Sequence, residues 1–77
     1  LYYILKMKKQ TIHILVNGKK NIVNLNTKLD DLLNTLEIDI NSVAIEINKE
    51  VIPKSKYNIT KLKINDKIEV VHFIGGG

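Results

Sequence analysis

The sequence predicts an α+β domain in which one main helix packs on one face of a mixed sheet of four to five strands. Three observations carry this prediction. Two short stretches near the start alternate apolar and polar residues and are joined by an Asn-Gly pair. The next apolar residues recur at helical spacing, and alternation then returns toward the end of the chain. A hairpin followed by one crossing helix and further strands is typical of a helix layer on a sheet.

The first two strands are predicted to form a hairpin. The apolar residues that alternate onto one face of the first strand are Ile12, Ile14 and Val16. Asn17-Gly18 follows, and this pair is the strongest short hairpin signal because a type I′ turn needs positive φ at both central positions. Residues 21–25 return as the second strand, with Val23 and Leu25 on a shared face. Strands joined by so tight a turn are antiparallel neighbours.

The period then changes to that of a helix over about residues 28–36. Four leucines spaced at i, i+3, i+4 and i+7 mark one apolar face: Leu29, Leu32, Leu33 and Leu36. Thr27 followed by Asp30 resembles a capping box, with Asp in place of the usual Glu. Asp30 and Asp31 lie in the first turn, where the helix dipole favours negative charge. The leucine face is therefore predicted to be core and not a cofactor site.

Alternation returns in a third strand, whose apolar residues are Val43, Ile45 and Ile47. Asn48-Lys49 turns the chain into a short strand at Val51-Ile52. Pro53 ends this strand because proline cannot donate to a sheet. A turn or short helical turn is expected up to Tyr57, and the meandering segment after it is predicted to be anchored by Ile59, Leu62 and Ile64.

The final strand is predicted over residues 67–74, after a turn at Asn65-Asp66. The order of elements makes the first and last strands parallel neighbours at the centre of the sheet. This arrangement is the β-grasp, the fold of ubiquitin. We therefore predict a single β-grasp domain over residues 1–74, in which residues 1–10 form an N-terminal extension or the start of the first strand. Residues 75–77 form a flexible glycine tail.

Composition excludes several classes of function. The 77 residues include no cysteine, which removes disulfides, thiolate metal sites and a cysteine nucleophile or persulfide. His13 and His72 lie far apart without ligand-like spacing, so we expect no metal site. The net charge of +4 comes from scattered lysines without arginine, which favours a solvated surface over nucleic-acid binding. No apolar run is long enough to span a membrane.

The end of the chain is the candidate functional segment. Gly75, Gly76 and Gly77 form a thin tail that can enter a narrow channel, where a side chain would block it. Because the last strand alternates, its outward residues are predicted to form a partner-docking site with the residue that precedes the tail: Val71, Phe73 and Ile74. Aromatic residues dominate interface hot spots, so Phe73 is the candidate anchor. The alternative is that Phe73 packs under the N-terminal extension, against Tyr2, Tyr3 and Ile4 on the neighbouring strand.

At this point the residues resemble a known family. The run at residues 43–54, VAIEINKEVIPK, resembles the central stretch of ThiS-type sulfur carriers, and the last four residues, IGGG, resemble their glycine tail. The resemblance covers about residues 11–77. Lys49 replaces the usual turn glycine and is the more strained choice if positive φ is needed there. Lys54 replaces the usual arginine.

The resemblance implies a carrier protein of thiamine biosynthesis and not an enzyme. The Gly77 carboxylate would be adenylated by a partner enzyme that uses ATP, and would then become a thiocarboxylate that donates sulfur for thiazole formation. The implied partners are this adenylylating activating enzyme, thiazole synthase, and a sulfur donor such as a cysteine desulfurase. The chain itself would bind no cofactor and contain no catalytic residue. The implied compartment is a bacterial cytoplasm or a plastid stroma.

Three other readings stay open at this point. The small subunit of molybdopterin synthase shares the fold, the tail and the thiocarboxylate, although the motif around Asn48 favours the thiazole carrier. A ubiquitin-like protein-conjugating modifier would instead end with Gly77 joined to a lysine of a partner. A β-grasp interaction domain with an inert tail would show no adenylation.

Overall fold

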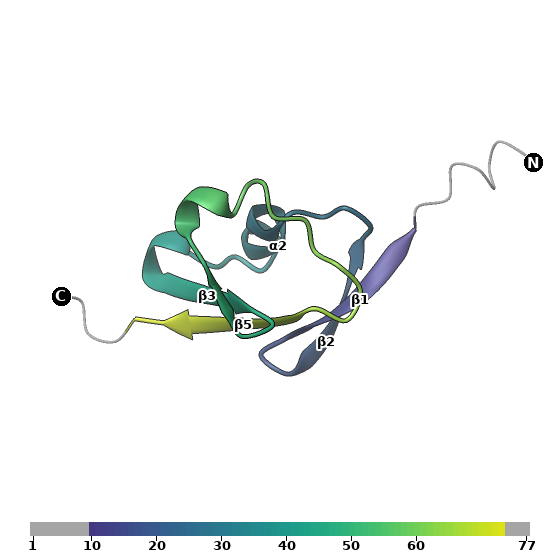
Figure 1. The fold of residues 1–77 in the computed structure, drawn as a ribbon, viewed down its shortest axis with the longest axis horizontal. Helices are drawn as coiled ribbons and strands as arrows, with labels where there is room; N and C mark the ends of the chain where they lie inside the picture. Colours follow the sequence, from purple (N-terminus) through teal and green to yellow (C-terminus); the bar gives the residue numbers. More distant parts are fainter. Residues whose placement is uncertain (1–9, 74–77) are drawn as a thin grey trace, which may run out of the picture.

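The computed structural model describes residues 10–73, and five strands of this part form one mixed sheet with a helix on one face (Figure 1). The strand order is β2-β1-β5-β3-β4. The elements are β1 (Thr11–Val16), β2 (Lys19–Asn24), α2 (Leu29–Thr35), β3 (Val43–Ile47), β4 (Glu50–Ile52) and β5 (Lys67–His72), with 3₁₀ turns η1 (Ile40–Ser42) and η2 (Lys54–Lys56). β5 occupies the centre and is parallel to β1, while every other pairing is antiparallel. The structure thus confirms the predicted β-grasp and its parallel pair.

The first hairpin forms through the predicted turn. Asn17 and Gly18 have φ values of 49° and 82°, which are the positive angles that a type I′ turn requires. Val23 packs against the core. Leu25 lies beyond the end of β2 and is 45% exposed, so of the two residues predicted on a shared face only Val23 packs against the core. The reason is that the chain turns at Asn26, where φ is 70°.

The core lies between α2 and the sheet. Its buried side chains come from β1, α2, β3, β5 and the segment between β4 and β5: Ile12, Ile14, Val16, Leu29, Leu32, Leu33, Val43, Ile45, Ile47, Tyr57, Leu62, Ile68 and Val70. Leu36 is the C-cap of α2 and is 36% exposed. Of the three predicted anchors in the segment before β5, only Leu62 is buried. Ile59 and Ile64 are 67% and 56% exposed, whereas Tyr57, earlier in the same segment, is 4% exposed.

The N-terminus of α2 differs from the prediction. The capping box expected between Thr27 and Asp30 does not form, because the N-cap residue is Lys28. The Thr27 hydroxyl donates to a carbonyl of the preceding turn, at 2.6 Å. The segment that follows β4 crosses this end of the helix, so the Leu29 N–H donates to the Thr60 carbonyl at 2.8 Å. A backbone carbonyl distant in sequence therefore satisfies a helix N–H that a cap side chain usually serves.

The β3–β4 turn contains two non-glycine residues in left-handed conformations. Asn48 and Lys49 have φ values of 52° and 74°. The left-handed conformation costs a residue with a Cβ roughly 1–2 kcal/mol, and asparagine tolerates it better than lysine does. Lys49 is therefore the strained residue of this turn, as the sequence indicated.

Replacing Lys49 with glycine is expected to stabilise the protein. The substitution relieves the left-handed strain but adds backbone entropy to the unfolded chain, at about 0.5–1 kcal/mol. We expect a net gain of up to about 1 kcal/mol in the free energy of unfolding, measured by urea denaturation. Lys49→Ala is the matched control, because it removes the ammonium group but keeps the Cβ. An equal gain in both variants would assign the effect to charge and not to the backbone.

Candidate functional site: the end of β5 and the open sheet face

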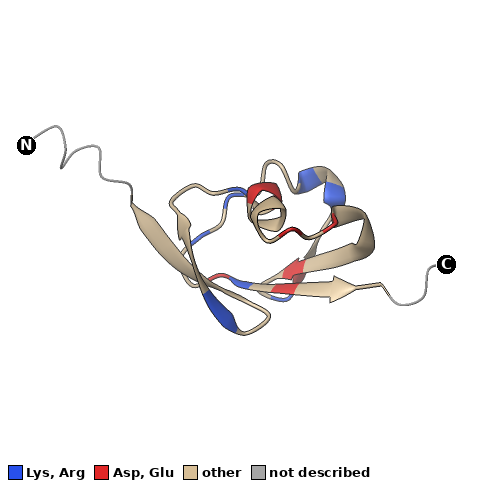
Figure 2. Ribbon diagram, turned by 180° about the vertical axis from the view of Figure 1, so that it is seen from behind, with Lys and Arg blue, Asp and Glu red and all other residues tan. Residues whose placement is uncertain are grey.

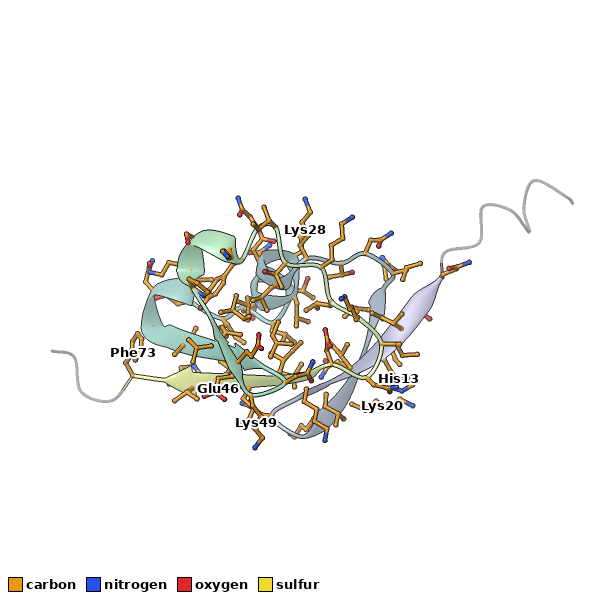
Figure 3. The ribbon with its side chains drawn as sticks, in the orientation of Figure 1. His13, Lys20, Lys28, Glu46, Lys49 and Phe73 are labelled. Atoms are coloured by element: carbon orange, nitrogen blue, oxygen red, sulfur yellow. The ribbon has the colours of Figure 1, made fainter. Side chains whose placement is uncertain are left out.

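β5 presents one face to the core and the other to solvent. Ile68 and Val70 are 1% and 7% exposed and point toward α2. Val71 and Phe73 are 49% and 66% exposed, and Figure 3 shows Phe73 at the end of β5. The predicted alternation of the last strand is therefore confirmed. Ile74 and the three glycines lie outside the described residues.

The two sides of β5 are paired over different lengths. On one side, β1 ends where Val16 pairs with Ile68, near the start of β5. On the other side, β3 accompanies β5 to its end at His72. The Phe73 N–H then donates to the carbonyl of Ser42 at 2.9 Å. The last residues of β5 are therefore held mainly from the β3 side.

The position of Ser42 is itself fixed by a capping carboxylate. Asp39 is the N-cap of η1 and accepts a hydrogen bond from the Asn41 N–H at 3.0 Å and one from the Ser42 hydroxyl at 2.9 Å. Both donors stabilise the ionised carboxylate, and the Asn41 N–H has the larger effect, so the pKa of Asp39 lies below its usual value. The cap thus helps to place the carbonyl that receives the Phe73 N–H.

The parallel register determines which strand lies beside Phe73. β1 and β5 run in the same direction and overlap only where β1 ends, so the start of β1 and the end of β5 lie at opposite ends of the sheet (Figure 1). In the described residues the strand beside the end of β5 is β3 and not β1. The proposed neighbours of Phe73, namely Tyr2, Tyr3 and Ile4, lie outside the described residues.

Neighbouring strands add residues to this exposed surface. Because Ala44 pairs with Val71, and Glu46 pairs with both Glu69 and Val51, their side chains lie on the same open face. We call this set the β5 patch: Ala44, Glu46, Val51, Glu69, Val71 and Phe73. Figure 2 shows acidic segments next to each other on β3 and β5.

The acidic pair of the β5 patch was not predicted from the sequence. Glu46 and Glu69 are directly opposite on two central strands. Like charges in this position destabilise a sheet, so folding stability does not account for the pair. The signal that could have found it is the register between β3 and β5, which the alternation of each strand alone does not give.

The part of the open face near β1 contains a hollow. A hollow of about 400 Å³ at the β1 end is lined by His13, Leu15, Lys20, Asn65 and Lys67. His13 and His72 occupy ordinary strand positions, as expected. Within residues 10–73 no cluster of three or more His, Cys, Asp or Glu side chains could hold a metal ion. No helix of this region is long and apolar enough to cross a membrane.

Burial also shifts the pKa of one core residue. Tyr57 is 4% exposed, and desolvation raises the pKa of its hydroxyl above the usual value. Its carbonyl accepts a hydrogen bond from the Asp30 N–H at 3.2 Å, so Tyr57 belongs to the packing of α2. It is far in the fold from the β5 patch, which lies on the opposite face of the sheet.

The topology and a last strand that leads into three glycines define a ubiquitin-like β-grasp protein. The sequence profile of the ThiS family matches residues 8–77. The crystal structure of the thiamine biosynthesis protein ThiS from Geobacter metallireducens is similar, with a TM-score of 0.76 and 30% identity over 86% of this chain and 100% of that chain. The chain belongs to the ThiS family and is a ThiS-type sulfur carrier.

A second solved structure agrees with this assignment. The NMR solution structure of a thiamine biosynthesis protein from Geobacter metallireducens has a TM-score of 0.68 and 30% identity, covering 86% of this chain and 88% of that chain. A comparison with curated protein sequences found no significant match. The family assignment therefore rests on the profile and on the solved structures.

Proposed function

We propose that this chain carries sulfur for thiazole formation in thiamine biosynthesis, as a thiocarboxylate on Gly77. Membership of the ThiS family, whose profile match extends through the glycine tail, is the observation that carries the proposal. The exposed end of β5 supports it, because it places an apolar surface directly before the tail.

The chemistry is dictated by the carboxylate. A carboxylate is a poor electrophile at neutral pH, so the Gly77 carboxylate must first attack ATP on an activating enzyme. This step forms an acyl-adenylate and releases pyrophosphate. A persulfide, supplied by a donor such as a cysteine desulfurase, then attacks the acyl carbon and displaces AMP, which gives an acyl disulfide. A thiol cleaves the S–S bond of this acyl disulfide, so that the thiol is oxidised to a disulfide and the thiocarboxylate is left on Gly77. The thiocarboxylate passes its sulfur to a substrate held on thiazole synthase.

In this scheme the chain contributes a docking surface and a tail, and it is not an enzyme. ATP belongs to the activating partner, and the chain binds no cofactor of its own. Val71, Phe73 and Ile74 contact the partner, and Gly75 and Gly76 pass through a narrow channel that a side chain would block. Cysteine is absent from the sequence, so a persulfide on the carrier itself is excluded.

Complementation tests the proposed product. The gene is expressed in one bacterial strain that lacks its own thiazole sulfur carrier and in another that lacks the small subunit of molybdopterin synthase. We expect growth without thiamine in the first strain and no molybdenum-cofactor activity in the second. The opposite pattern would assign the chain to molybdopterin. Isopeptide adducts between Gly77 and partner lysines, detected by mass spectrometry, would assign it to protein conjugation.

Phe73→Ala tests the docking role of the β5 patch. Phe73 is 66% exposed, so its removal is expected to leave the melting temperature nearly unchanged. Truncating an aromatic anchor at an interface costs about 2 kcal/mol or more of binding free energy. We therefore expect affinity for the activating enzyme or for thiazole synthase to fall by at least about tenfold, as measured by calorimetry.

Ile59→Ala is the matched control for this experiment. Ile59 is 67% exposed but lies outside the β5 patch, in the segment before β5. Its replacement is expected to change neither stability nor affinity. If Phe73→Ala binds both partners as tightly as the Ile59→Ala protein, Phe73 is not part of the docking surface.

A further inference from the structure

The side-chain amide of Asn17 makes hydrogen bonds to β5 that the backbone of a neighbouring strand would usually make. The backbone pairing of β1 with β5 ends with the Asn17 N–H, which donates to the Ile68 carbonyl at 2.9 Å. Farther along β5, the Val70 N–H donates to Asn17 Oδ1 at 2.7 Å, and Asn17 Nδ2 donates to the Val70 carbonyl at 3.3 Å. The amide thus replaces the peptide group that β1 would have supplied if it continued.

The turn alone does not require these two bonds. The position needs a residue that tolerates a φ of 49°, and glycine, aspartate and asparagine all do so in type I′ turns. Glycine offers no side-chain partner to Val70. Aspartate accepts a hydrogen bond but, when ionised, donates none. Of the three, asparagine is the residue that serves both the turn and the two bonds.

The two bonds act where β5 would otherwise be supported from one side. Past Ile68, backbone pairing of β5 is provided by β3, up to His72. A strand flanked on one side only presents unpaired N–H and C=O groups along the other. Asn17 pairs both groups of Val70, the residue immediately before the exposed Val71. It therefore fixes the place from which the docking residues and the tail extend.

We propose that Asn17 is a positioning residue for activation of the tail. Through Val70, its amide sets the direction in which the end of β5 leaves the sheet, and so the direction of the tail relative to the β5 patch when the activating enzyme binds. This inference rests on the proposed function. A misplacement of about 1 Å in a reacting group can cost about a hundredfold in rate. The predicted defect is therefore in the chemical step and not in docking.

Asn17→Gly and Asn17→Asp test the proposal. Glycine keeps the turn and removes both bonds, whereas aspartate keeps the acceptor for the Val70 N–H. Pyrophosphate release is measured in single turnovers with ATP and the activating enzyme, well below the melting temperature and over a range of enzyme concentrations. We expect Asn17→Gly to lower the saturating rate by about ten- to a hundredfold. The concentration of activating enzyme that gives half of the saturating rate should change little. The saturating rate of Asn17→Asp is expected to lie between that of Asn17→Gly and that of the unmodified protein.

Asn48→Gly is the matched control, since Asn48 holds the start of β5 from the other hairpin turn. Its Oδ1 accepts the Lys67 N–H at 2.9 Å and its Nδ2 donates to Asp66 Oδ1 at 2.9 Å. This variant is expected to unfold at a lower temperature but to react at the normal saturating rate. Hydrogen exchange adds a second readout: the Val70 amide should exchange faster in Asn17→Gly and normally in Asn48→Gly.

The outcomes separate this inference from the proposed function. If Asn17→Gly melts at a lower temperature but reacts at the normal saturating rate, the amide has only a structural role and the inference is wrong. If Asn17→Gly does not fold, a normal saturating rate for Asn17→Asp, with fast exchange at Val70, overturns the inference as well. If the unmodified protein releases no pyrophosphate with the enzyme, the proposed function fails and the inference fails with it.

Discussion

Leu33→Ala is expected to lower the free energy of unfolding by about 2–5 kcal/mol. Leu33 is among the largest of the fully buried side chains. Alanine at this position loses the transfer free energy of the deleted atoms and leaves a cavity between α2 and the sheet. Domains of this kind have a total stability of about 5–15 kcal/mol. A single truncation is therefore expected to remove a large share of it.

Urea denaturation of Leu33→Ala and of Leu36→Ala measures this effect. Leu36 is on the same predicted stripe but is 36% exposed at the C-cap of α2, so its replacement is expected to cost much less. A loss below about 0.5 kcal/mol for Leu33→Ala is what an ordinary surface substitution gives. Such a result would show that the assigned face of the helix is wrong.

Local patterns were sufficient to predict the regular parts of the fold. Asn17-Gly18 specifies its turn because glycine and asparagine tolerate positive φ. Alternation in β3 and β5 identified the buried faces, since successive side chains of a strand point in opposite directions. The change of period at Leu29 separated the helix from the strands. Each of these signals lies within a few residues of the position that it describes.

The irregular segment between β4 and β5 could not be predicted in the same way. It has no period, so the sequence does not show which apolar residues point inward. Tyr57 is buried while Ile59 and Ile64 are exposed, because the segment passes over the start of α2. The same crossing supplies the carbonyl of Thr60 to the helix N-terminus. The local resemblance of Thr27 and its neighbours to a capping box was therefore overridden by tertiary structure.

Only part of the candidate site could be predicted from the sequence, and the reason is similar. The exposure of Val71 and Phe73 follows from alternation within one strand. The pairing of Glu46 with Glu69, and that of Asn17 with Val70, depend on the register between segments distant in sequence. Register is set by how whole strands bury their apolar faces. A pattern read along one segment does not contain it.

Removing Gly77 is expected to nearly abolish sulfur acquisition while leaving docking intact. One fully extended residue spans at most about 3.3–3.6 Å, so a carboxylate on Gly76 falls short by that length. Attack on ATP requires the reacting atoms to lie about 3–3.5 Å apart and aligned. The proposed docking residues Val71 and Phe73 are unchanged, so the shortened protein should bind the activating enzyme with normal affinity.

Gly76→Leu is also expected to lose sulfur acquisition, but for a different reason. The two variants therefore separate the effect of tail length from the effect of entry into the channel. This variant keeps the full length of the tail, but its side chain would collide with the wall of a channel that admits glycine. The melting temperature should be normal in both variants, because the buried residues of the described core lie between Ile12 and Val70. The measurements are adenylate formation with the activating enzyme and the intact mass of the product, in which one oxygen is exchanged for sulfur.

A third variant, which lacks residues 75–77, decides between the possible roles of the tail. If the protein without Gly77 acquires sulfur at the full rate, the last glycine is dispensable and Gly76 can carry the thiocarboxylate. If the protein without all three glycines still acquires it, the sulfur is attached elsewhere and the proposed role of the C-terminal carboxylate is wrong. Loss of sulfur in all three variants, with normal binding and folding, is the result that the proposal requires. Such a result would place the chemistry at the Gly77 carboxylate and the recognition in the folded domain.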